Sequence, residues 1–165
     1  MTRQTLVAGI GNIFLSDDGF GVEVSNSLKS RQMPEGVRVA EFGIRGVHLA
    51  YELLDGYDSL VLIDAVPMGE EPGTVAVIEP DVASLQSDEA QIMDAHSMSP
   101  AVVLGTLARL GGSVEKILIV GCQPGSLEEG IGLSAPVAAA VEPAVEMCCQ
   151  VVANLYQTSG KETAA

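Results

Sequence analysis

Basic residues are scarce in this sequence: 8 lysines and arginines stand against 22 acidic residues, which gives a formal charge of −14. A surface of that sign repels phosphate backbones and anionic lipids, so neither nucleic acid nor a membrane surface is an expected partner. It suits a basic protein or a metal cation, although a high charge also simply keeps a protein in solution. Because no apolar stretch reaches about 18 residues, the sequence predicts no transmembrane helix.

Cysteine is scarce as well. Cys122, Cys148 and Cys149 are the three cysteines, and no Cys-x-x-Cys pair is present. This pattern predicts neither a disulfide framework nor a zinc knuckle, and it favours the reducing cytoplasm. The first residues lack the apolar stretch and the cleavage site of a signal peptide, in agreement with that location. A Gly-x-Ser-x-Gly motif is missing too, so a serine triad is not predicted.

Apolar residues, in contrast, are plentiful. They make up 47% of the 165 residues, and the mean hydropathy is +0.33. This composition is typical of a folded globular protein of one domain. We therefore expect a single domain over residues 1–165, with a frayed tail over residues 157–165.

Short β-branched runs alternate with helical ones along the chain. The first three strands with their two intervening helices form a βαβαβ unit, which implies parallel pairing. The fourth strand follows Asp64 after only a short link rich in proline and glycine, so it is predicted to run antiparallel to a neighbour. Strands are expected over Thr5–Ile10, Val37–Glu41, Ser59–Ile63, Thr74–Ile78 and Lys116–Val120, and helices over Gly21–Ser30, Val47–Leu54 and Ser99–Leu110, followed by a long C-terminal helix that ends near Tyr156.

Two carboxylates and an imidazole are the candidate functional residues. Asp18 follows the first strand, Asp64 closes the apolar run of the third, and His96 lies just before a helix. Strand ends on one edge of an open α/β sheet converge, so such distant residues can share a site. Two oxygen donors and one imidazole suit a divalent transition metal and leave coordination positions open for a substrate.

Simpler roles compete with this one. Asp17 and Asp18 both precede a helix, where either can act as an N-cap, and we expect one to cap and the other to bind metal. Asp64 can brace the loop that follows it, and a lone histidine such as His96 is more often a surface residue. Asp94 is placed to fix the tautomer of His96. Arg45, next to Gly43 in the loop after the second strand, is a candidate for holding a ligand, with a solvated role equally open.

Other motifs are weaker. Gly9-Ile10-Gly11 resembles a dinucleotide fingerprint, but position 14 is Phe in place of the third glycine, and the loop carries acids where a pyrophosphate would rest. Cys122 is a candidate nucleophile with His96 as its base, although packing is the commoner role of such a cysteine. His48 is interpreted as an ordinary residue of a helix surface.

Residues 9–21, which read Gly-Ile-Gly-Asn-Ile-Phe-Leu-Ser-Asp-Asp-Gly-Phe-Gly, resemble the opening motif of the hydrogenase maturation proteases. The Asp64-Ala65 strand end, the segment around His96 and the Pro-Gly loop before the C-terminal helix are similar to that family in order and spacing. These endopeptidases remove a C-terminal extension from the large subunit of nickel–iron hydrogenase. The resemblance covers the chain from Thr5 to about Tyr156.

The resemblance implies a fold and a site. The fold class is α/β, a three-layer αβα sandwich around a five-stranded, mixed, mostly parallel sheet of the phosphorylase/hydrolase-like kind. The site is an aspartic-type peptidase centre in which Asp18, Asp64 and His96 recognise nickel supplied by the substrate, and Arg45 and Gly43 contact the precursor of the large subunit. The loop after the second strand departs from the family's Asp-Gly-Gly-Thr type, which leaves the cognate hydrogenase open. The alternatives are a regulatory domain that binds a nucleotide or another small ligand, and a non-catalytic nickel chaperone.

Overall fold

A computed structural model describes residues 3–80 and 100–164 of the chain. Its centre is a five-stranded sheet in the order β2-β1-β3-β5-β4. Strands β2, β1, β3 and β5 are parallel, and β4 pairs with β5 in the antiparallel direction. The mixed sheet and its antiparallel fourth strand are therefore confirmed. The strands are β1 (Thr5–Ile10), β2 (Val37–Gly43), β3 (Ser59–Ala65), β4 (Val75–Ile78) and β5 (Lys116–Cys122).

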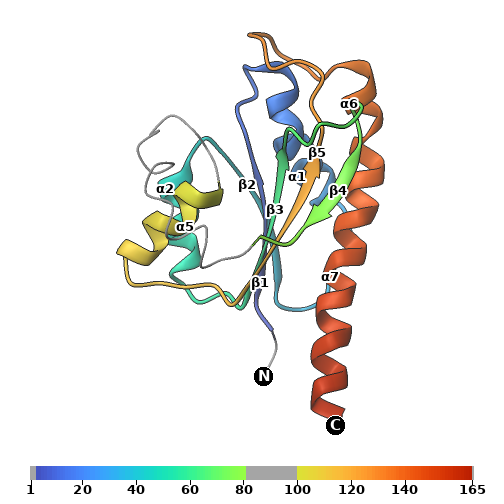
Figure 1. Cartoon of the computed structure of the whole chain (residues 1–165). Helices are drawn as coiled ribbons and strands as arrows, with labels where there is room; N and C mark the ends of the chain where they lie inside the picture. Colours follow the sequence, from blue (N-terminus) through green and yellow to red (C-terminus); the bar gives the residue numbers. More distant parts are fainter. Residues whose placement is uncertain (1–2, 81–99, 165) are drawn as a thin grey trace.

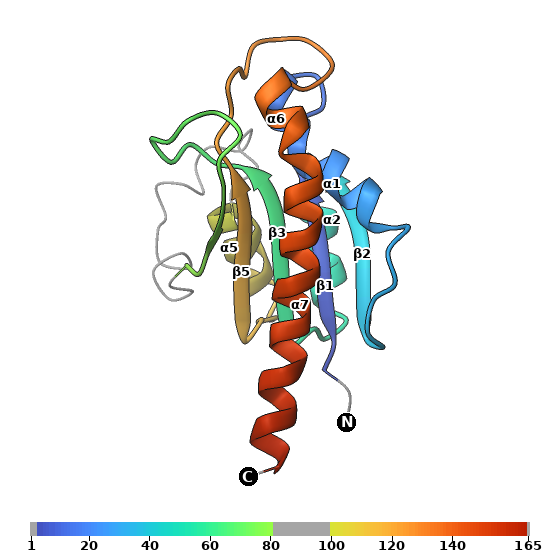
Figure 2. The ribbon, with the colours of Figure 1, turned by 90° about the vertical axis from the view of Figure 1, so that its right-hand side faces the viewer.

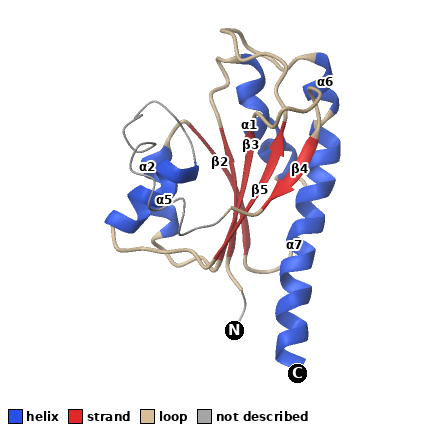
Figure 3. Cartoon of the chain, viewed as in Figure 1, coloured by secondary structure: helices blue, strands red, loops and turns tan. Residues whose placement is uncertain are grey.

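Helices cover both faces of the sheet, as Figures 1 and 2 show, which gives the expected three layers. Helices α1 and α7 contact one another on one face, and α2 and α5 contact one another on the other. Figure 3 shows the sheet between these two helical layers. The helices are α1 (Phe20–Leu28), α2 (Gly46–Leu53), α5 (Pro100–Arg109), α6 (Ala135–Ala139) and α7 (Val141–Ala164), and a 3-10 turn, η1 (Ser16–Gly19), precedes α1. Among the described residues no helix is both long and apolar enough to span a bilayer.

Strands β1 and β3 are buried along their whole length, because both of their faces are covered. Successive side chains of a strand point to opposite faces, so the core is split into two clusters. On β3, Val61 and Ile63 pack on the α1 and α7 side, whereas Leu60 and Leu62 pack on the α2 and α5 side. Gly21 brings α1 close to the sheet, because a Cβ at that position would collide with the carbonyl oxygens of neighbouring strands.

The predicted boundaries need three corrections. Strand β2 runs to Gly43, two residues beyond its expected end at Glu41. Strand β3 runs on through Asp64 and Ala65, which pair with Gly121 and Cys122 of β5, so pairing across the sheet extends both strands beyond their apolar runs. The C-terminal helix α7, which was expected to end near Tyr156, runs on to Ala164. No proline interrupts α7 after its first turn, and a helix that has already formed propagates through polar residues at little cost.

The loops at the carboxyl ends of the parallel strands gather at the top of Figure 1. The segment after β1 and the long loop between β5 and α6 lie side by side there in both Figures 1 and 2. A parallel bridge between Leu15 and Gly130 joins them. This edge of the sheet is where α/β proteins place their ligand sites.

Candidate functional site: a carboxylate pair at the sheet edge

Asp18 and Asp64 meet beside Gly11. Gly11 has a φ of +131°, and a Cβ at this position would collide with the carbonyl oxygen of Asp18 and lie 3.7 Å from Oδ1 of Asp64. Asp64 is held by β3 in the middle of the sheet, and Asp18 belongs to η1. The structure therefore brings together two of the three residues that the sequence singled out.

The backbone around Asp18 is fixed by local hydrogen bonds. The N–H of Asn12 donates to Oδ2 of Asp18 over 2.8 Å, and the N–H of Phe14 donates to Oδ1 of Asn12 over 2.9 Å. Asn12 therefore orients the loop and one oxygen of the acid. The sequence analysis did not select Asn12, although a Gly-Asn pair at the end of a strand is a turn signal that could have drawn attention to it.

Asp64 is 9% exposed, and its carboxyl group has a strongly shifted pKa. Burial raises the pKa of its carboxyl group well above the ordinary value, the charge of Asp18 raises it further, and the N–H of Ala65 opposes the shift. None of the ion pairs among the described residues includes either acid. Two neighbouring acids without a cationic partner form a site that a bound cation would stabilise.

Asp17 has a different role from its neighbour. Its side chain is fully buried, and its carboxylate accepts hydrogen bonds from the N–H groups of Gly125, Ser126 and Ser134 and from the Ser134 hydroxyl, all over 2.7–2.8 Å. Burial alone would raise its pKa, but these donors hold it below the ordinary value. Neither Asp17 nor Asp18 caps α1 with its side chain, so the expected N-cap is wrong. Asp17 braces the loop between β5 and α6, and Asp18 is left at the site.

His96, the third predicted ligand, and its proposed partner Asp94 lie outside the described residues. Within the described part of the chain no group of three histidine, cysteine or acidic residues is placed to hold a metal ion. A metal ion bound by the two acids would therefore require at least one further donor. His96 stays a prediction for that position.

Gly43 and Arg45 line a pocket of about 430 Å³ directly beside Gly11 and Asn12. The guanidinium group of Arg45 donates to the carbonyl oxygens of Phe42 and Glu41, and its Nη2 lies 3.6 Å from Oε1 of Glu41. Arg45 is thus tied to its own loop, while half of its side chain stays exposed at the pocket. Its predicted contact with substrate remains compatible with this placement.

The competing motifs fit the geometry less well. Cys122 is fully buried, and burial, together with the charge of Asp17, raises the pKa of its thiol to about 11, so a thiolate nucleophile is not favoured. In the glycine-rich loop the Asn12 N–H, which a phosphate would need, is already bound to Asp18. His48 is exposed on α2, as expected.

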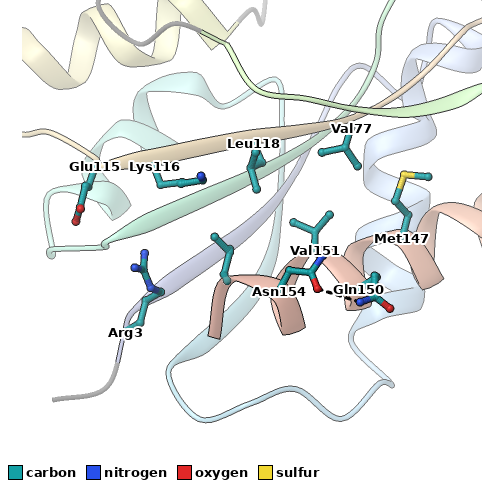
Figure 4. A pocket seen from close by; sticks show the side chains of 10 residues that line it. Arg3, Val77, Glu115, Lys116, Leu118, Met147, Gln150, Val151 and Asn154 are labelled. Atoms are coloured by element: carbon teal, nitrogen blue, oxygen red, sulfur yellow. Dashed lines mark hydrogen bonds between the residues drawn. The ribbon is translucent and has the colours of Figure 1, made fainter. Parts of the chain in front are cut away.

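A second pocket, of about 530 Å³, lies far from the acids. Figure 4 shows it between α7 and the strands β4 and β5, with Arg3 and Lys116 at one end. Arg3 precedes β1 and Lys116 begins β5, so that end of the pocket lies at the amino ends of the strands. The pocket near Gly11, at the opposite edge of the sheet, is the one that adjoins the carboxylate pair.

Comparison with known proteins identifies the class of this site. A family model described as hydrogenase maturation protease matches residues 22–151. The hydrogenase 2 maturation protease of Escherichia coli K12 is 33% identical over 158 residues, which cover 94% of this chain and 92% of the relative. The hydrogenase expression/formation protein HupD of Bradyrhizobium diazoefficiens is 32% identical over 164 residues, covering 98% and 84%. The solved structure of the hydrogenase maturating endopeptidase HybD from Escherichia coli has a TM-score of 0.74 at 32% identity, and the match covers 94% of each chain.

The fold, the sheet-edge site and these relatives define the class as a hydrolase of peptide bonds. More narrowly, the chain belongs to the hydrogenase maturation protease family. It is a hydrogenase maturation endopeptidase, as the resemblance in the sequence had implied.

Proposed function

We propose that this protein removes the C-terminal extension from the large-subunit precursor of a nickel–iron hydrogenase after nickel has been inserted. The pair formed by Asp18 and Asp64 beside Gly11 is the observation that carries the nickel part of this proposal. A divalent cation brought by the precursor would offset the repulsion between the two acids. Cleavage would then depend on the presence of the metal in the substrate.

The proposed nickel ligands are one oxygen each from Asp18 and Asp64 and a ring nitrogen of His96. This set is borderline in softness and too small to fill an octahedral or square-planar coordination sphere, so positions remain for ligands from the precursor. The metal is cargo of the substrate, and the purified protein should hold little of it. Arg45 and Gly43 are proposed to contact the precursor chain at the neighbouring pocket.

The hydrolysis is proposed to be of the aspartic type. A carboxylate oxygen of the pair that faces the scissile bond accepts a proton from a water molecule, and the water oxygen adds to the carbonyl carbon. The carbon–nitrogen bond then breaks, and the departing amine takes up the proton. In the metal-free chain, burial and the charge of Asp18 raise the pKa of Asp64, so its carboxylate accepts a proton more readily than an exposed one.

We place this reaction in the cytoplasm. Cys122, Cys148 and Cys149 are free thiols, which fits a reducing compartment.

The test is to incubate the protein with nickel-loaded and nickel-free precursor and to follow the mass of the large subunit. We expect only the loaded form to be shortened, and we expect Asp18→Asn and Asp64→Asn to abolish the reaction. Asp55→Asn, which changes an exposed acid at the end of α2, is the matched control and should retain activity. Equal processing of both precursor forms would refute nickel recognition. Tight stoichiometric nickel binding without cleavage would instead indicate a chaperone.

A further inference from the structure

Large apolar side chains are exposed at the edge of the sheet that holds the acids. Phe14 is 60% exposed, Leu127 is 46% exposed and Ile131 is 80% exposed. Single exposed apolar residues are common on protein surfaces and need no explanation. These three, like the neighbouring Ile13 at 42% exposure, lie on two segments that are joined to each other beside the carboxylate pair.

Main-chain hydrogen bonds hold the two segments together. The N–H of Gly130 donates to the carbonyl oxygen of Phe14, and the N–H of Ser16 donates to the carbonyl oxygen of Gly130, both over 2.9 Å. The Ser16 hydroxyl donates to the carbonyl oxygen of Glu128 over 2.7 Å. Residues held by these hydrogen bonds lie next to both Leu127 and Ile131. The backbone of the loop therefore keeps the two side chains at the surface.

The same segments lead directly to the acids. Phe14 donates its N–H to Asn12, and Asn12 donates its own N–H to Asp18. Farther along the loop, Asp17 accepts the N–H groups of residues that precede Leu127 and follow Ile131. A polypeptide that reaches Asp18 and Asp64 from the side of these two segments would therefore pass over or beside the exposed apolar side chains.

The negative charge around these side chains restricts which polypeptides can bind there. Glu128 and Glu129 are exposed between Leu127 and Ile131, and the whole chain carries a formal charge of −14. An apolar surface set among acids favours a partner with apolar side chains next to lysine or arginine, and it repels an acidic one.

We propose that Phe14, Leu127 and Ile131, here called the apolar rim, form the docking surface for the precursor polypeptide that flanks the scissile bond, and that the rim selects apolar residues with basic neighbours. This inference rests on the proposed function and adds to it the surface that receives the substrate. Docking buries the rim in the complex, so each truncated side chain should weaken binding of the precursor while the chemistry at Asp18 and Asp64 is unchanged.

The experiment measures KM and kcat for cleavage of nickel-loaded precursor by Leu127→Ser and Ile131→Ser. The matched control is Leu110→Ser, since Leu110 is a leucine of similar exposure, 41%, just beyond the end of α5. We expect KM to rise about tenfold for each rim variant, equivalent to about 1.4 kcal/mol, with kcat unchanged and the control at the wild-type value. Unchanged melting temperatures would show that all three variants fold.

The outcomes separate the two proposals. If the wild-type protein cleaves the precursor and both rim variants keep its KM, the apolar rim is not the docking surface, while the proposed function stands. If the rim variants change the oligomeric state in size-exclusion chromatography with light scattering and leave KM unchanged, the rim joins copies of this chain, and the inference is wrong. Failure of the wild-type protein to cleave loaded precursor would overturn the proposed function and this inference with it.

Discussion

Replacing Asp17 by alanine tests the brace between η1 and the loop before α6. The substitution removes a fully buried carboxylate that accepts four hydrogen bonds, three from backbone N–H groups and one from the Ser134 hydroxyl. Because these donors come from residues 125–134, more than a hundred positions away in the sequence, no local contact can replace the carboxylate. The loop between β5 and α6 would lose these four hydrogen bonds to the segment that carries Asp18 and keep those made by the main chain and by Ser16.

The size of the effect follows from the kind of bond that is lost. A hydrogen bond to a charged group contributes about 1.5–3 kcal/mol to the free energy of unfolding. Gly125 is exposed and Ser126 and Ser134 are half-buried, so water can satisfy part of what Asp17→Ala leaves open. We therefore expect Asp17→Ala to lower the free energy of unfolding by roughly 3 kcal/mol, which corresponds to about two such bonds. For a chain of this length this lowers the melting temperature by about 6–12 °C.

The assay is thermal unfolding of the wild type and of Asp17→Ala at several pH values. In the folded chain the pKa of Asp17 is held below its ordinary value of 3.8, so the folded state binds this proton more weakly than the unfolded state. The carboxylate therefore stabilises the fold above that value, and the contribution is lost as the pH falls through the lowered pKa. The difference between the two proteins should be complete at neutral pH and shrink in acid.

Asp18→Ala is the control, because this neighbouring acid accepts a single hydrogen bond, from the N–H of Asn12. Asp18→Ala should lower the free energy of unfolding by about 1–2 kcal/mol or less, since the Asp18 side chain is only partly buried. A loss below about 1 kcal/mol for Asp17→Ala, or a difference that stays constant with pH, would refute the brace.

Three further predictions concern the site. The raised pKa of Asp64 means that the folded chain binds this proton more tightly than the unfolded chain, so the free energy of unfolding falls as the pH rises above 3.8. In calorimetry without metal, Asp64→Asn should therefore have a higher melting temperature than the wild type at neutral pH and the same melting temperature in acid. Gly11→Ala should abolish precursor cleavage because its Cβ collides with Asp18, whereas Gly56→Ala, at a positive φ but in open space, should keep full activity. Cys122 should resist iodoacetamide at neutral pH in mass spectra of the folded protein, and Cys122→Ala should still cleave precursor; rapid alkylation or lost activity would revive the thiol mechanism.

The fold was largely predictable because its signals are local. The apolar runs of β1 and β3, the helical segments between the strands and the short link before β4 each reside in a few adjacent residues. The sequence did not predict the strand ends that depend on pairing across the sheet. Asp64 and Ala65 continue β3 because Gly121 and Cys122 lie opposite them on β5. The residues near Asp64 in the sequence give no sign of this pairing.

The candidate site divides in the same way. Asp64 stood out because a charge directly after four apolar residues is costly to bury unless it has a partner. The sequence could not show which of Asp17 and Asp18 lies at the site, since the N–H groups that donate to Asp17 belong to a distant loop. Asn12 was missed because its contribution depends on the shape of a turn. The exposure of Phe14 and Ile131 likewise follows from which loops meet at the edge of the sheet.

Strand β3 carries Asp64 between two parallel neighbours, whereas the exposed side chains around it belong to connections outside the sheet. Under the proposed function, Asp64 and the exposed residues Leu127 and Ile131 are thus encoded in separate stretches of the gene, whereas Asp18 and Phe14 share one connection. If the proposed roles are correct, changes in the loop between β5 and α6 would alter the docking surface and leave Asp64 in place. A lineage with several hydrogenases can in this way supply each one with its own dedicated processing enzyme from one ancestral scaffold.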